Sequence, residues 1–102
     1  MKIPERLDIL GYEYQVLNEV THNDSHYGHA KHKDAKIILY SSPDYTMPEQ
    51  IEAETLLHEI IHAIDTALCL DLDENTVTRL SKGLFAVIRQ NNLDFRKDTP
   101  NA

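Results

Sequence analysis

The sequence predicts an α+β domain in which a small antiparallel sheet is followed by two packed helices. In residues 1–45 apolar side chains alternate with polar ones, which is the spacing of half-buried strands. In residues 46–92 they recur at steps of three and four, which is the spacing of amphipathic helices. The chain has 102 residues, of which 41% are hydrophobic and 26% charged, as is typical of one globular domain. We therefore expect a single domain over residues 1–92 and a flexible, frayed tail over residues 93–102.

The first half of the chain holds the strand signals. Gly11 lies between two alternating runs and predicts a turn or bulge. Residues 36–40 form a short, strongly apolar and β-branched segment, which predicts a buried strand. Turn-forming residues at 41–44 end this strand. The alternating apolar positions are Leu7, Ile9, Tyr12, Tyr14 and Val16.

The second half predicts two helices. Residues 46–49 have the Thr-x-x-Glu pattern of a capping box, with Pro48 early in the first turn. We expect the first helix at about 47–69, and a second helix that Asp71 or Asp73 caps and that ends near Asn91. The apolar stripe of the second helix consists of Val77, Leu80, Leu84, Val87 and Ile88.

The charge balance bears on the class of partner. The formal net charge is −7, and nucleic-acid binding depends on Lys and Arg side chains that neutralise phosphates. We therefore expect no nucleic-acid partner. A local basic stretch at Lys31, Lys33 and Lys36 is interrupted by Asp34, and we interpret it as a solvated strand edge.

Cysteine content and hydropathy favour a soluble protein. Cys69 is the only cysteine, so neither an intramolecular disulfide nor a cysteine-based zinc site is expected, and we expect Cys69 to pack as a small hydrophobe. The N-terminal residues lack the apolar run of a signal peptide. No stretch approaches the roughly 20 apolar residues of a membrane span. We expect a cytoplasmic protein with no membrane partner.

The segment His58-Glu59-Ile60-Ile61-His62 carries the strongest functional signal. Two helical histidines four residues apart lie on one face, where both imidazoles can reach a single zinc ion. Glu59 is rotated by roughly 100° around the helix axis, so it is badly placed as a ligand. It is well placed as the general base that deprotonates a zinc-bound water. The segment therefore predicts a zinc site with His58 and His62 as ligands and Glu59 as the catalytic group.

A catalytic zinc also needs a third protein ligand and one open position. The candidates are Asp65, Asp71, Asp73, Glu74 and an upstream histidine cluster. Asp65 is three residues after His62, where it better suits acceptance of the spare imidazole N–H than direct ligation. Glu74 opens the second helix and can face the first helix if the two pack antiparallel.

The two helical segments resemble a minimal zincin of the gluzincin type. In that group the His-Glu-x-x-His helix is followed by a helix that supplies a Glu ligand, in a pattern close to Asn-Glu-x-x-Ser-Asp-x-Phe. The resemblance places Glu74 at the ligand position and Leu80 at the apolar one. Thr78 stands where the family has an Asp that orients a motif histidine, a task that Asp65 would then take. The step from His62 to Glu74 is shorter than usual in that group.

The chain also resembles small phage and prophage metallopeptidase-like proteins related to the ImmA/IrrE peptidases. In those proteins a Gly and an Ile-x-Leu strand precede a Leu-Leu-His-Glu-Ile-Ile-His-Ala-Ile-Asp helix. Gly28, residues 37–39 and residues 56–65 match these features. The resemblance covers roughly residues 28–90 and implies a zinc peptidase fold without naming a substrate.

Two further groups of residues are candidates for the site. The histidine cluster has three readings: a polar surface loop, which is the simplest, an accessory metal site, or the rim of an active cleft beside bound peptide. The cluster consists of His22, His26, His29 and His32. Three tyrosines are candidate oxyanion donors, although sheet tyrosines more often serve packing. They are Tyr27, Tyr40 and Tyr45.

Three functions are compatible with these signals. The first is a zinc metallopeptidase that acts on a peptide or protein through Glu59, with zinc on His58, His62 and Glu74. The second is a non-catalytic zinc-binding phage or prophage protein that serves as a protein-interaction module. The third is a helix-pair interaction module without metal.

Overall fold

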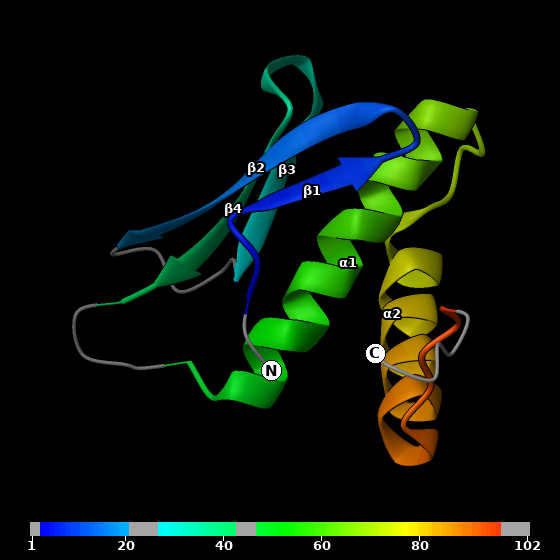
Figure 1. Cartoon of the computed structure of the whole chain (residues 1–102). Helices are drawn as coiled ribbons and strands as arrows, with labels where there is room; N and C mark the ends of the chain where they lie inside the picture. The colour runs from blue at the N-terminus through cyan, green and yellow to red at the C-terminus, as the bar shows by residue number, and fades with distance from the viewer. Residues whose placement is uncertain (1–2, 21–26, 43–46, 97–102) are drawn as a thin grey trace.

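The structure, a computed structural model, describes residues 3–20, 27–42 and 47–96. A four-stranded sheet is followed by two packed helices, so the predicted α+β class is confirmed (Figure 1). In chain order the elements are β1 (Arg6–Ile9), β2 (Tyr12–Val20), β3 (Gly28–Lys31), the 3₁₀ turn η1 (His32–Asp34), β4 (Lys36–Ser41), α1 (Glu49–Leu68) and α2 (Glu74–Asn91).

A tight turn joins β1 and β2, as the position of Gly11 predicts. Leu10 and Gly11 both have positive φ, at 50° and 89°. Two successive residues with positive φ are characteristic of a type I′ turn, whose twist matches that of the strands it joins. Gly11 reaches this conformation at no steric cost, and Ile9 pairs with Tyr12 across the turn.

The sheet is mixed, so the prediction of an antiparallel sheet is wrong in one pairing. Its strand order is β1-β2-β4-β3, and β4 runs parallel to β2 and antiparallel to β3. Period-two alternation shows which face a side chain occupies but carries no information about strand direction. The signal that distinguishes β4 is its continuous apolar run, which is typical of a strand covered on both faces. Ile37, Ile38 and Leu39 are all at most 2% exposed.

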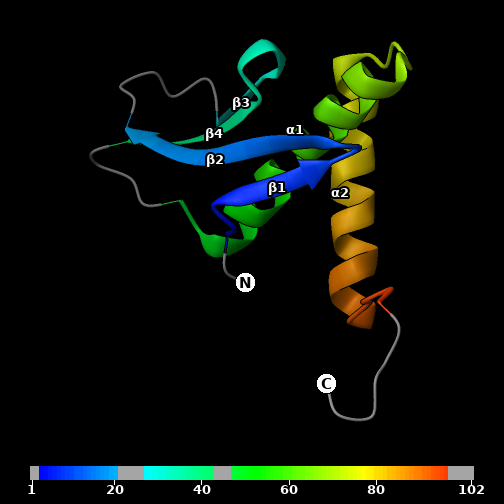
Figure 2. The same cartoon turned by 45° about the horizontal axis from the view of Figure 1, so that its top comes forward.

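Helix α1 covers one face of the sheet and completes the core (Figures 1 and 2). Leu56 and Ala63 on α1 pack with Tyr14, Val16 and Ile37 of the sheet. Strand β3 lies at the edge beside α1. The basic stretch accordingly falls on and next to an edge strand, where Lys31 and Lys33 are exposed.

The start of α1 differs from the predicted capping box. The helix begins at Glu49 with Pro48 at the N-cap, where no side chain caps it. Glu49 is therefore the first helical residue instead of the third, while Thr46 lies outside the described residues. Proline suits a helix start because its missing N–H has no partner there in any case. At the other end, Cys69 caps α1 in a left-handed conformation with φ 53°. Its side chain is exposed, so the expectation that Cys69 packs as a small hydrophobe is wrong.

Helix α2 begins as predicted, with Asp73 at its N-cap accepting a hydrogen bond of 2.7 Å from the Thr76 N–H. Its apolar stripe is largely exposed, and only Val77 of the predicted stripe is buried. Figure 2 shows the reason: the C-terminal half of α2 extends away from the sheet. Of the predicted tail, the structure describes residues 93–96, where Leu93 N–H bonds back to the Ile88 carbonyl. Within the described part of the chain, no helix is long and apolar enough to span a membrane.

Candidate metal centre

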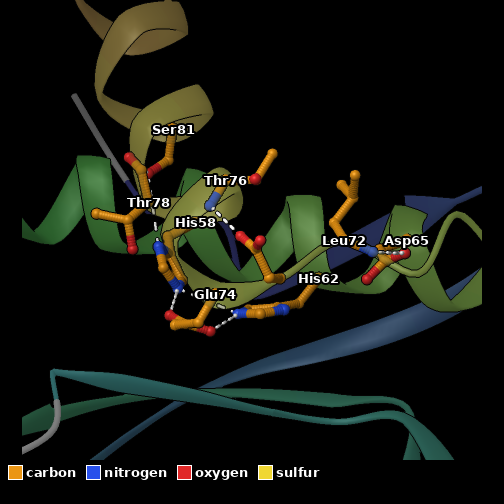
Figure 3. Close-up of polar contacts among 9 residues, drawn as sticks. His58, His62, Asp65, Leu72, Glu74, Thr76, Thr78 and Ser81 are labelled. Carbon is orange, nitrogen blue, oxygen red and sulfur yellow. Dashed lines mark hydrogen bonds and ion pairs between the residues drawn. The ribbon is translucent and has the colours of Figure 1, made fainter.

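The two helices bring the three predicted ligands together (Figure 3). His58 and His62 stand one turn apart on α1, and Glu74 is the first residue of α2. The two carboxylate oxygens of Glu74 lie 2.8 Å from Nε2 of His58 and 2.9 Å from Nε2 of His62. The two Nε2 atoms are 3.1 Å apart. These three residues therefore lie close enough to hold a metal ion.

The chemistry of this donor set fits a metal. Tetrahedral zinc with ligand bonds of 2.0–2.1 Å separates its ligand atoms by about 3.4 Å. The observed separations of 2.8–3.1 Å are a few tenths of an ångström shorter, so small side-chain movements would accommodate the ion. Two imidazole nitrogens and a carboxylate are a ligand combination suited to transition metals.

The connection between the helices fixes where Glu74 lies. The Asp65 carboxylate accepts a hydrogen bond of 3.3 Å from the Leu72 N–H, and the Asp65 carbonyl accepts one of 3.2 Å from the Leu70 N–H. Asp65 thus fastens the loop after α1, and its expected role as partner of a motif imidazole is not seen. Asp71, with φ 60°, and the capping Asp73 do not join the ligand group, so of the three candidates after α1 only Glu74 does.

Ser81, which was not predicted from the sequence, contacts the ring nitrogen of His58 that is turned away from Glu74. Ser81 is 1% exposed, and its hydroxyl donates a 2.9 Å hydrogen bond to the Thr78 carbonyl. The same oxygen lies 3.5 Å from Nδ1 of His58, where it can accept the imidazole N–H (Figure 3). That arrangement leaves Nε2 as the free lone pair on the metal side. The only sequence signal is spacing, since Ser81 is two turns after Glu74 on the same face of α2.

Glu59 follows His58 in α1, is buried, and does not belong to the group of candidate ligands. Burial, and secondarily the negative charge of Glu74, raises its pKa to about 7. The side chain of Glu59 lies against β3: a Cβ added to Gly28 would be 3.1 Å from Oε2 of Glu59. The close approach of strand and helix at Gly28 thus encloses this carboxylate.

A cleft of about 420 Å³ is lined by two of the three ligands, His58 and Glu74, and by Glu59, whereas His62 does not line it. Its floor is the N-terminal half of α1, one wall is the start of β3 with Tyr27 and Gly28, and the other wall is α2. Of the three tyrosines considered as candidate oxyanion donors, Tyr27 lines the cleft. Tyr40 does not line it, and Tyr45 lies outside the described residues.

The histidine cluster is divided by the structure. His29 lies on β3 and His32 in η1, while His22 and His26 lie outside the described residues. Nδ1 of His32 is 3.3 Å from the Tyr14 hydroxyl. Burial, followed by the charges of His62 and His29, lowers the pKa of His32. Within the described ranges, His29 and His32 form no accessory group of metal ligands.

Compared with protein-family models, curated proteins and solved structures, the chain gives no match. The geometry of these residues is therefore the basis for assigning a function.

Proposed function

We propose that the chain is a small zincin-like metallopeptidase that uses zinc to hydrolyse peptide bonds. One observation carries the proposal: His58, His62 and Glu74 converge, and two of them, His58 and Glu74, line one cleft together with the buried residue Glu59. Three protein ligands are the number that leaves zinc a further position for water or substrate.

The residues around the cleft have separate tasks in this reaction. Zinc, when bound, supplies a Lewis acid that polarises the scissile carbonyl and makes water more acidic. The Glu59 carboxylate takes one proton from the attacking water as the oxygen adds to the carbonyl carbon. It then gives that proton to the leaving amine as the C–N bond breaks, so that one water is added across the bond. Ser81 holds His58 in the tautomer that turns Nε2 to the metal.

The edge of the sheet supports a peptide as the substrate. Strand β3 is an edge strand, and its first residue, Gly28, lines one wall of the cleft together with Tyr27 just before it. An extended peptide can add to an exposed strand edge through backbone hydrogen bonds. The zincin resemblance implies the same placement, with the peptide antiparallel to the edge strand.

The test is zinc content together with peptide hydrolysis by the wild type and Glu59→Gln. We expect about one zinc per chain in both proteins and loss of turnover by a factor of roughly 10² or more in the variant. Glu19→Gln, at an exposed position on β2, is the matched control and should keep full activity. Equal turnover in Glu59→Gln would remove the general-base role, and substoichiometric zinc would remove the metal site.

A non-catalytic zinc domain that binds a protein partner is the second candidate. The exposed apolar stripe on α2, at Leu80, Leu84 and Val87, favours it because such surfaces often mark protein contacts. This candidate predicts one zinc per chain with no hydrolysis by the wild type. Turnover that depends on Glu59 would exclude it.

A further inference from the structure

An ion pair spans the cleft away from the metal ligands. The Lys82 ammonium of α2 lies 3.7 Å from the Glu54 carboxylate of α1, and both residues line the cleft. The two partners differ in exposure: the Lys82 side chain is 66% exposed and the Glu54 side chain 29%. A group that enters from solvent therefore meets the ammonium before the carboxylate.

The charges of the cleft leave Lys82 as the group available to a ligand. Among the described residues that line it, Lys82 is the one Lys or Arg beside three carboxylates. Glu74 lies against the two histidines, Glu59 is buried, and Glu54 faces Lys82. Lys82 has three N–H donors, and its contact with Glu54 is too long for a strong hydrogen bond.

Beyond Glu74, helix α2 carries no acidic side chain. From residue 75 to the end of α2 the sequence contains Arg79, Lys82 and Arg89 and no Asp or Glu. Of these three cations only Lys82 lines the cleft. A substrate carboxylate at this end of the cleft therefore has the Lys82 ammonium as its partner of opposite charge.

Helix geometry gives the distance of this pair from the reacting bond. Glu54 precedes His58 by one turn of α1, which is about 6 Å along the helix axis. An extended peptide advances about 3.3 Å per residue. A substrate residue next to Lys82 is then one or two positions from the bond that is cut.

We infer that Lys82 is a specificity-determining residue that selects peptides with a carboxylate one or two residues from the scissile bond. Glu54 occupies the position of that carboxylate when no substrate is bound. The inference rests on the proposed zinc site and adds the substrate class, an acidic peptide.

The test measures binding of peptide hydroxamates to the zinc-loaded protein, so it needs no turnover. In the first series of tripeptides, the hydroxamate is at the C-terminal end. In the second series, a succinyl cap carries the hydroxamate at the N-terminal end. Each series compares Glu with Gln at the first and second positions from the hydroxamate. We expect Glu to bind about fivefold more tightly than Gln in one series, which is the upper range for an exposed ion pair.

Three variants make the result specific to Lys82. Lys82→Met should abolish the preference for Glu, and Lys82→Glu should favour a Lys-containing probe. Arg79→Met removes an exposed cation of α2 that does not line the cleft, so it should keep the preference. Equal binding of Glu and Gln in both series, or a preference that survives Lys82→Met, would overturn the inference and leave the proposed function intact. Failure of all hydroxamates to bind would overturn both, whereas Glu preference without peptide hydrolysis would overturn only the peptidase.

Discussion

At Gly28, strand β3 packs tightly against α1. A Cβ at this position would lie 2.8 Å from Thr55 Cγ2, 3.1 Å from Glu59 Oε2 and 3.2 Å from the Ile38 carbonyl oxygen. Gly28→Ala should therefore push strand and helix apart, destabilise the fold by about 1–3 kcal/mol and reduce turnover through displacement of Glu59. Zinc affinity should change little, because neither Gly28 nor Glu59 is a ligand. Denaturant unfolding, zinc titration and peptide hydrolysis measure the three effects.

Gly83 is the matched control for this substitution. A Cβ there meets nothing within 4 Å, and the residue lies inside α2. Gly83→Ala should stabilise the protein by about 0.5–1 kcal/mol, since Ala loses less backbone entropy in a helix. If both alanine variants behaved alike, the close packing at Gly28 would not be the cause of its effect.

In the proposed zinc site, Ser81 would act on the metal through His58. Ser81→Ala removes the acceptor of the imidazole N–H, and loss of such a partner typically weakens metal binding by about 10–100-fold. Competition with a zinc chelator would measure the change. Thr66→Ala, an exposed position on α1, should leave the affinity unaltered. An equal loss in both variants would contradict a positioning role for Ser81.

The metal-site residues differ in how far the sequence reveals them. His58, Glu59 and His62 are predictable because helix geometry alone places residues four apart on one face. Glu74 needs one further assumption, that the helices pack antiparallel. Ser81 and Gly28 matter through contacts between α2, β3 and α1, and no local pattern indicates those contacts.

The N-terminus of α2 positions Glu74, and Asp73 stabilises that end. The hydrogen bonds from Thr76, chiefly from its backbone N–H, hold the pKa of Asp73 below its usual range. Asp73→Ala should lower the unfolding temperature by a few degrees at neutral pH and weaken zinc binding several-fold, because Glu74 is the next residue. Thermal unfolding and zinc titration measure both effects.

The pH dependence of this cap follows from the sign of the shift. A carboxyl whose pKa is lowered on folding contributes stability above its unfolded pKa, near 3.8, and loses it as pH falls through the folded pKa. The wild type and Asp73→Ala should therefore converge in stability in strong acid. Asp73→Asn keeps a capping side chain without the charge, so its contribution should not titrate. A difference between wild type and Asp73→Ala that persists unchanged into strong acid would contradict this account.

At the level of elements, the helices were predictable to within a few residues and the strand directions were not. Caps such as Asp73 and apolar steps of three and four are local signals. The direction of β4 depends on its insertion between β2 and β3, which is a tertiary event. The prediction of a capping box was wrong because proline suits the N-cap position as well as the first turn. The same sequence is therefore compatible with two different start positions of the helix.

The metal should also stabilise the whole molecule, since its ligands come from both helices. Zinc that binds only the folded chain adds about 4 kcal/mol when free zinc is roughly a thousandfold above its dissociation constant. Calorimetry should show a rise in unfolding temperature that a chelator reverses. Mg²⁺ should give no such shift, because imidazole is a poor ligand for it. An unfolding temperature that is the same with and without zinc would contradict the proposed zinc site.

The molecule is more extended than the sequence indicates. Its radius of gyration is 14.5 Å, whereas a compact domain of this length has about 13 Å. The projecting half of α2 contributes to this extension (Figure 2). The sequence reveals the apolar stripe of α2, but periodicity does not say whether a partner covers it, and Leu84 and Val87 remain about half exposed.

The parallel pairing of β2 with β4 has a consequence for how the chain folds. Parallel neighbours require a long crossover, and closing that loop carries an entropic cost before any pairing rewards it. The helix pair is local in sequence, and all three candidate metal ligands lie within residues 58–74. Contacts close in sequence form faster than distant ones. The metal site can therefore assemble ahead of the sheet, and a zinc ion captured early would serve as a nucleus for the remaining structure.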